Sequence, residues 1–164
     1  GGDGLAAIEI GRMARAAKAH AFVRGRCASA CLFIFAGSMV RAAPDGAVGI
    51  HRARITRQVK GVGEVNVDLA STPKAAEFLE DTNHRMQAYL EEIGMPNTLF
   101  EAMMSIPANR TRFLTRRELA EYGLLPDSEP QAKALAAQDR CAPATATVTQ
   151  FARCYRRVAA PRPG

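Results

Sequence analysis

Short apolar stretches alternate with longer helical patterns along the first 127 residues of the sequence. Three runs, 21–23, 39–43 and 47–51, have the length of buried strands. Residues 3–20 and 73–93 repeat apolar side chains at helical spacing; the first would bury Leu5, Ile8, Met13 and Ala17. Strands that alternate with helices predict an α/β fold, in which helices cover a mostly parallel sheet.

Local start and stop signals place the ends of several helices. Asp3 is a good N-cap, and Pro73 suits the first turn of a helix. Gly94 is expected to end the long helix that begins there. Thr115 and Glu118 have the spacing of a capping box and predict one more short helix, which runs to about residue 122.

The composition changes after residue 127. Residues 128–164 are rich in Ala and Pro and carry six Lys/Arg against two Asp/Glu, so +4 of the chain's net charge of +6 lies there. We therefore predict one domain over 1–127 and a basic Ala/Pro-rich C-terminal extension over 128–164. Such an extension is either a solvated tail or a contact for nucleic acid or anionic lipid. Aromatic residues make up only 6% of the chain, so stacking platforms are scarce and no specific nucleic-acid partner is expected.

The apolar runs are too short for a membrane span. The longest, Ala30 to Ala36, has seven residues, against the roughly 20 that cross a bilayer. No transmembrane segment is therefore expected. The sequence opens on Gly1-Gly2 rather than on a charged region with an apolar core, so we expect no signal peptide in this chain.

The chain contains an even number of cysteines, Cys27, Cys31, Cys141 and Cys154. Their spacing is not that of a zinc site, so no metal is expected. An even number is compatible with an oxidising compartment, which favours a periplasmic or otherwise exported protein. Cys141 and Cys154 could close a loop in the extension. Cys27 and Cys31 could be buried structural cysteines, a local disulfide or, less in keeping with the pattern, nucleophiles.

Ser29 is the first candidate catalytic residue. It lies where a strand is expected to turn into an apolar helix, between Ala28 and Ala30. Small neighbours permit a tight turn and leave the hydroxyl accessible, and backbone N–H groups at the helix start could face a developing oxyanion. The run lacks the G-x-S-x-G pattern of α/β-hydrolases. The alternative is that Ser29 is a helix cap.

His51 is the second candidate, because it follows Val48-Gly49-Ile50 at the end of a predicted strand. Active-site residues of parallel sheets gather at such ends, and a neutral histidine is a natural base for a serine hydroxyl. The alternative is an ordinary surface or core histidine. His20 and His84 fall at the end and in the middle of predicted helices and have weaker claims.

Four short motifs follow one another in an order that can be compared with known families. They are Gly1-Gly2-Asp3 before an Ala-rich helix, Cys27-Ala28-Ser29-Ala30-Cys31, Gly49-Ile50-His51-Arg52, and the run from Arg112-Phe113-Leu114 to Glu121-Tyr122-Gly123-Leu124. Over residues 1–127 this order resembles the Clp protease proteolytic-subunit (ClpP/crotonase-like) family. The Cys-x-Ser-Ala-Cys setting is closer to the periplasmic Clp-protease-like proteins of bacteria.

The resemblance implies a ClpP/crotonase-like fold of stacked β-β-α units, here without the first strands of the family. It implies a serine peptidase-like hydrolase with Ser29 as nucleophile and His51 as general base. The backbone N–H groups of Gly2 and Ala30 would hold the oxyanion. A peptide or protein would be the substrate, the family's rings suggest a homo-oligomer, and neither a metal nor a nucleotide cofactor is expected.

The third catalytic residue departs from the family pattern. The family has an aspartate shortly before the closing motif, and Pro107 occupies that place here. The nearest polar side chain is Asn109. An asparagine can orient a catalytic histidine in a Cys-His-Asn triad, so Asn109 is the candidate. It could equally be a turn residue, which would leave a Ser-His dyad.

Three other functions remain open from the sequence. A non-catalytic ClpP-like binding or scaffold module would keep the fold and lack a complete triad. A crotonase-type enzyme acting on a thioester would use paired oxyanion N–H groups without a Ser-His couple. The basic extension could bind nucleic acid without sequence specificity. The distance between the Ser29 hydroxyl and the His51 ring discriminates the peptidase from the first two alternatives.

Overall fold

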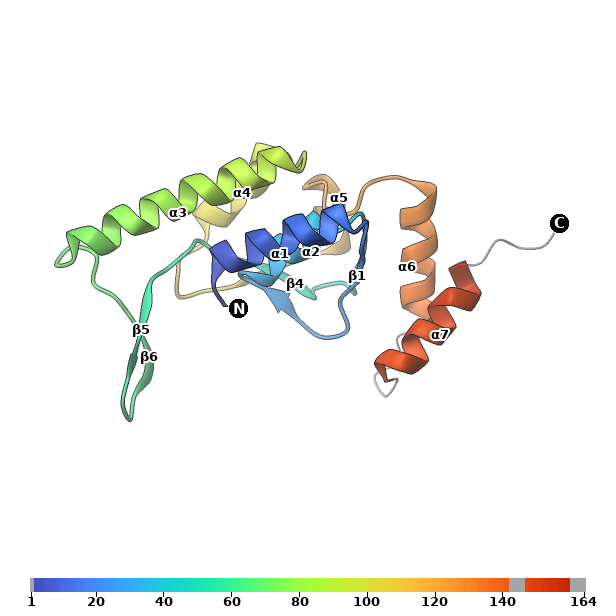
Figure 1. Cartoon of the computed structure of the whole chain (residues 1–164), viewed down its shortest axis with the longest axis horizontal. Helices are drawn as coiled ribbons and strands as arrows, with labels where there is room; N and C mark the ends of the chain where they lie inside the picture. The colour runs from blue at the N-terminus through green and yellow to red at the C-terminus, as the bar shows by residue number, and fades with distance from the viewer. Residues whose placement is uncertain (1, 142–146, 160–164) are drawn as a thin grey trace.

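Three helices pack side by side over short strands in the computed structural model of the chain, which describes residues 2–141 and 147–159 (Figure 1). They are α1 (Gly4–Ala16), α2 (Cys31–Gly37) and α3 (Pro73–Glu92), and α1 contacts both of the others. The molecule is thus a mixed α/β protein. Gly1 of the first motif and residues 142–146 and 160–164 of the predicted extension lie outside the described residues.

The described strands form three small sheets, where the sequence predicted a mostly parallel one. In the first sheet, β1 (His20–Phe22) is parallel to β3 (Val40–Ala42). In the second, β4 (Val48–Ile50) is parallel to β2 (Cys27–Ala28) and antiparallel to β7 (Arg112–Leu114). The third is an antiparallel hairpin of β5 (Thr56–Val59) and β6 (Gly63–Asn66). The strands have two to four residues each. β4 lies between β2 and β7 and is fully buried. It therefore supports the turn that follows β2.

A buried tyrosine joins the three helices. Tyr89 of α3 is fully buried, and its hydroxyl donates a hydrogen bond to the Phe33 carbonyl of α2 at 3.1 Å. Gly11 of α1 leaves the space for this contact, because a Cβ there would lie 2.7 Å from the Phe33 carbonyl oxygen. Burial raises the pKa of Tyr89 to about 12. The position of α2, and of the turn that leads into it, is therefore fixed by both neighbouring helices.

The structure confirms the helix ends that local signals in the sequence predicted. The Asp3 carboxylate accepts the N–H groups of the first turn of α1, and Gly94 follows α3 with φ of +78°. Thr115 and Glu118 form both hydrogen bonds of a capping box at α5 (Arg116–Glu121). Between α3 and β7 lies one further helix, α4 (Asn97–Ser105). These features are set by neighbouring residues, which is why spacing alone identified them.

The first part of the predicted extension packs on the domain before it. Helix α6 (Glu129–Cys141) lies against β3, where the Gln131 side chain accepts the Arg41 N–H at 2.9 Å and donates to the Arg41 carbonyl. Farther along, the Gln138 amide donates to the Val23 carbonyl at 2.8 Å. These amides satisfy backbone groups that another strand would pair with in a larger sheet.

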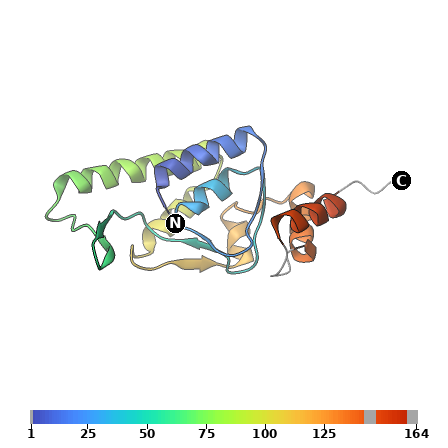
Figure 2. The same cartoon turned by 60° about the horizontal axis from the view of Figure 1, so that its bottom comes forward.

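Helix α7 (Val148–Ala159) completes this end of the molecule (Figure 2). A disulfide between Cys141 and Cys154 joins it to α6. Its aromatic side chains Phe151 and Tyr155 contact Phe22 of β1 edge to face. The described part of the extension is therefore attached to the sheet through β1 and β3.

Arg41 is a buried cation on β3. Its guanidinium donates to the carbonyls of Ala36, Ser38, Gly123 and Leu124 at 2.6–3.2 Å. Burial lowers the pKa of Arg41 to about 10, so the group still carries its charge at neutral pH. The Arg41 guanidinium donates to carbonyls at the end of α2 and in the segment after α5, so it links these two regions to β3.

Candidate active site

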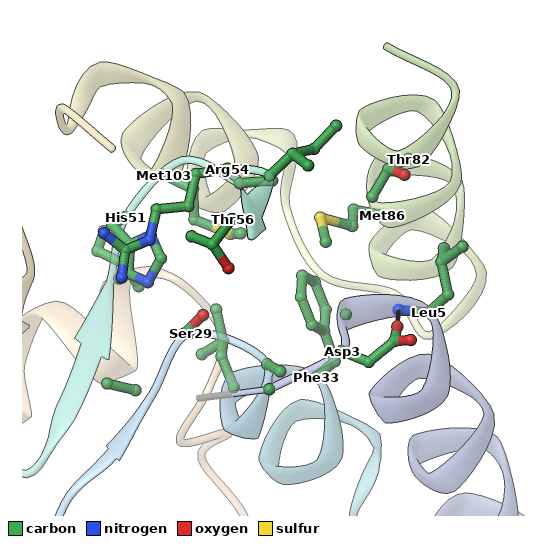
Figure 3. Close-up of a pocket in the computed structure, with 18 of the residues that line it drawn as sticks. Asp3, Leu5, Ser29, Phe33, His51, Arg54, Thr56, Thr82, Met86 and Met103 are labelled. Atoms are coloured by element: carbon green, nitrogen blue, oxygen red, sulfur yellow. Dashed lines mark hydrogen bonds between the residues drawn. The ribbon is translucent and has the colours of Figure 1, made fainter. Parts of the chain in front are cut away.

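A pocket of about 780 Å³ opens beside the N-terminus of α1 (Figure 3). Its wall is built by the first residues of α1, the turn between β2 and α2, the segment after β4, and side chains from α3 and α4. Four of the five candidate site residues line it: Gly2, Ser29, Ala30 and His51. The fold therefore brings together residues that lie up to 49 positions apart in the chain.

Ser29 occupies a strained turn between β2 and α2. Its φ is +61°, a left-handed conformation that is uncommon for a residue other than glycine. The Ser29 N–H donates to the Gly49 carbonyl of β4 at 3.2 Å, and the Ser29 carbonyl accepts the Leu32 N–H of α2 at 2.9 Å. One side of the residue thus continues the sheet while the other begins the helix. Such a sharp strand-to-helix turn presents a nucleophilic serine in α/β-hydrolases, although the G-x-S-x-G sequence is absent here.

The floor beneath this turn is closely packed around Gly49. Gly49 pairs with Ala28 of β2 on one side and Phe113 of β7 on the other. A Cβ at Gly49 would lie 2.7 Å from Thr111 Cγ2, 3.0 Å from Phe113 Cε1 and 3.1 Å from Ala28 Cβ. A glycine at this position therefore allows three strands to approach one another directly behind Ser29.

A disulfide encloses the same turn. Cys27 in β2 is bonded to Cys31, the first residue of α2, with the Cα atoms 5.2 Å apart. Only Ala28, Ser29 and Ala30 lie between the two cysteines. The local disulfide that the sequence left open is therefore present, and neither sulfur is a free nucleophile in this form.

His51 follows β4 directly and has a defined tautomer. Its Nδ1 lies 2.7 Å from the Arg52 carbonyl oxygen. Because a carbonyl can only accept a hydrogen bond, Nδ1 carries a proton, and in the neutral form of the ring the lone pair is therefore on Nε2. Arg52 is itself fixed to the end of α4, where its guanidinium donates to the Met104 carbonyl at 2.5 Å and its N–H to the Ile106 carbonyl at 3.4 Å.

Ser29 and His51 come from the ends of adjacent parallel strands. β2 and β4 run in the same direction, so the residues after them lie at the same edge of the sheet. Figure 3 draws both side chains on the wall of the pocket. In the described part of the chain no hydrogen bond joins the Ser29 hydroxyl to the His51 ring. The two groups share a pocket but are not hydrogen-bonded to each other in this conformation.

The backbone groups that the resemblance assigns to the oxyanion are also at the pocket. Ala30 is the residue before α2, and Gly2 lies exposed in front of the Asp3 cap of α1. Among the described residues, neither the Ala30 N–H nor the Gly2 N–H has a hydrogen-bond acceptor. Both residues line the pocket, so these unpaired donors are the candidates for binding a group held there.

Asn109 lies away from these groups. It is exposed in the loop between α4 and β7, and it is not among the residues that line the pocket. Thr111 of the same loop does line it. The hydrogen-bond partner of His51 Nδ1 is the Arg52 carbonyl. Residue types in the sequence could not reveal this partner, because every residue has a carbonyl; only the adjacency of Arg52 and His51 was visible.

The rest of the wall combines apolar side chains with polar and charged ones. Phe33 and the thioethers of Met86 and Met103 line it, and Figure 3 shows both methionines. Arg54 and Glu64 supply opposite charges from the segment after β4 and from β6. The pocket could thus take an apolar side chain together with a polar backbone.

Within residues 2–141 and 147–159 no three His, Cys, Asp or Glu side chains are grouped so that they could hold a metal ion. The helices in these ranges are all too short or too polar to cross a bilayer. Comparison of the chain with family models, with curated proteins and with solved structures found no match.

Proposed function

We propose that the chain is a serine hydrolase of the peptidase type, with Ser29 as nucleophile and His51 as general base. The observation that carries the proposal is the left-handed Ser29 on the turn after β2, which lines the same pocket as a histidine whose Nδ1 is bonded to a carbonyl. In this mechanism Nε2 takes the hydroxyl proton as Ser29 attacks the substrate carbonyl, and later returns it to the leaving group.

The Arg52 carbonyl takes the place of the missing aspartate in this proposal. It holds the Nδ1–H tautomer of His51, which is the role of the third group in a triad. The N–H groups of Ala30 and Gly2 would stabilise the oxyanion, since both lie at the pocket without an acceptor in the described chain. The mechanism requires the Ser29 hydroxyl to come within hydrogen-bond distance of Nε2 when substrate enters, while His51 keeps its bond to the Arg52 carbonyl.

The proposal extends to the fold family of the enzyme, its cellular compartment, its oligomeric state and its substrate. The order of motifs supports a ClpP/crotonase-like fold, in which β2, the Ser29 turn and α2 belong to one repeat unit. Two disulfides within the described residues fit an oxidising compartment such as the periplasm. The family's self-assembly supports a homo-oligomer, and an unfolded peptide segment would be the substrate.

A non-catalytic module is the second candidate, because no hydrogen bond between Ser29 and His51 is present among the described residues. A peptide would then bind in the pocket without being cleaved. This reading predicts a serine with ordinary reactivity.

A fluorophosphonate probe, which reacts with activated serine hydroxyls, discriminates the two candidates. The folded, oxidised chain is treated with the probe and the adduct is located by peptide mass spectrometry. We expect labelling of Ser29, its loss in Ser29→Ala, and unchanged labelling in Ser105→Ala, an exposed serine of α4 that serves as the matched control. A chain that remains unlabelled at Ser29 would favour the binding module.

A further inference from the structure

We propose that the Cys27–Cys31 disulfide positions Ser29, so that the site is active only while this bond is oxidised. The inference rests on the proposed function of Ser29 and adds a redox requirement to it. It makes Cys27 and Cys31 positioning residues, which act through Ser29 and do not touch the substrate.

The disulfide closes the chain around the strained residue. Cys27 is held in the sheet, where its N–H donates to the Ala47 carbonyl at 2.9 Å. Cys31 begins α2 on the opposite side of the turn. A covalent bond between these two points restricts the backbone dihedrals of the three residues between them, and Ser29 is the one with positive φ.

Few other contacts hold Ser29 in this conformation. Its neighbours Ala28 and Ala30 have no side chain beyond Cβ, and the Ser29 hydroxyl has no hydrogen-bond partner in the described part of the chain. The Ser29 backbone itself makes two hydrogen bonds, to Gly49 and Leu32. A left-handed serine persists only where its surroundings determine it, so loss of the disulfide should let φ relax.

We expect a dithiol reductant to attack this bond at Cys31, the more exposed of its two cysteines. Cys27 is 2% exposed, whereas Cys31 is partly exposed. A thiolate of the reductant attacks Cys31 Sγ, the S–S bond breaks, and the electron pair leaves on Cys27 Sγ, which takes a proton. The second thiol of the reductant then attacks the mixed disulfide and releases the Cys31 thiol. The protein gains two electrons and two protons, and the reductant becomes a disulfide.

The second disulfide provides a matched control. Cys141–Cys154 joins α6 to α7, and neither helix contributes to the pocket. Figure 1 shows both helices at the opposite end of the molecule from α3 and the hairpin of β5 and β6. Opening this bond changes the same number of thiols without touching the Ser29 turn.

The test compares the rate of fluorophosphonate labelling at Ser29 in four samples of the full chain. They are the oxidised protein, the protein treated with dithiothreitol, Cys27→Ser with Cys31→Ser, and Cys141→Ser with Cys154→Ser. Alkylation mapping records which thiols are free, and far-UV circular dichroism records the fold. We expect the rate to fall at least about fivefold, the effect of roughly 1 kcal/mol, on reduction and in the first double variant. Reoxidation should restore the wild-type rate, and the second double variant should label normally.

Two results would overturn the positioning role. One is an unchanged labelling rate when Cys27 and Cys31 are shown to be free thiols. The other is a loss of rate that merely follows loss of the helical signal, because the bond would then be a general stabiliser.

A failure of the proposed function is recognised separately, as an oxidised wild-type chain that does not label. The positioning role is then decided by NMR of the Ser29 backbone. The three-bond H–N–Cα–H coupling and Cα shift should report positive φ in the oxidised chain and lose that signature on reduction. The same values in both states would refute the inference.

Discussion

Gly49→Ala should destabilise the protein through crowding at a single point of the β2–β4–β7 sheet. The added Cβ would lie 2.7 Å from Thr111 Cγ2 and 3.0–3.1 Å from atoms of Phe113 and Ala28, against an optimum of about 3.5–4.0 Å for carbon contacts. The strands on both sides are tied to β4 by backbone hydrogen bonds, so relief requires a shift of β2 or β7. Overpacking of this kind costs about 1–3 kcal/mol of unfolding free energy.

Urea unfolding followed by far-UV circular dichroism measures this cost with the disulfides intact. Gly25→Ala is the matched control, because Gly25 is exposed, has no positive φ and has no atom within 4 Å of its added Cβ. It should be neutral, or stabilise the fold by up to about 1 kcal/mol. Thr111→Ala in the Gly49→Ala background removes the nearest clash and should restore at least about 0.5 kcal/mol. A Gly49→Ala protein as stable as the Gly25→Ala control would refute the close packing behind Ser29.

Two further substitutions test the supports of the site. Tyr89→Phe removes the hydrogen bond to the Phe33 carbonyl and should cost about 1 kcal/mol in urea unfolding. The pKa of Tyr89 is raised from 10 to about 12, so its contribution is fully present below about pH 10 and is lost as the pH rises towards 12; the variant should show less of this alkaline loss, and an identical pH profile would count against the buried hydroxyl. Gln131→Leu leaves the backbone groups of Arg41 without their side-chain partners and should cost about 1–3 kcal/mol, whereas an unaffected midpoint would mean that α6 is not part of the folded core.

The sequence predicted those features of the fold that are determined within a few residues. The cap at Asp3, the capping box of Thr115 and Glu118, and the end of α3 at Gly94 follow from local geometry. The buried stripe of α1 was only partly predicted. Met13 and Ala17 were expected inside. Met13 is 69% exposed, because α1 approaches α2 through Gly11, and Ala17 is exposed just beyond the end of α1. Close packing through a glycine leaves no apolar side chain for a periodicity argument to detect.

Features that depend on distant parts of the chain were not predictable. The antiparallel pairing of β7 with β4 joins segments more than 60 residues apart. Gln131 and Gln138 belong to a segment whose composition indicated a tail, yet both are buried against strands. Hydrophobic patterning does not identify an amide that replaces a neighbouring strand.

In the candidate site, too, the locally determined features were predicted and a feature that depends on distant contacts was not. The small residues around Ser29 predicted a tight turn, and the strand before His51 predicted its place at the sheet edge. The Arg52 carbonyl was not foreseen, since it is a backbone group whose orientation depends on contacts with α4. The catalytic role of Asn109 stays a prediction, and the structure places that residue outside the pocket lining.

The dependence of Ser29 labelling on His51 tests the central claim most directly. The rate of the fluorophosphonate reaction is compared in the oxidised wild type, in His51→Ala and in His84→Ala, which removes an exposed histidine of α3 outside the pocket lining. A general base contributes about 10²–10⁴-fold, so His51→Ala should slow the labelling of Ser29 by at least about a hundredfold while His84→Ala leaves it unchanged. Equal rates in all three proteins, with the fold intact by circular dichroism, would contradict a Ser29–His51 catalytic pair.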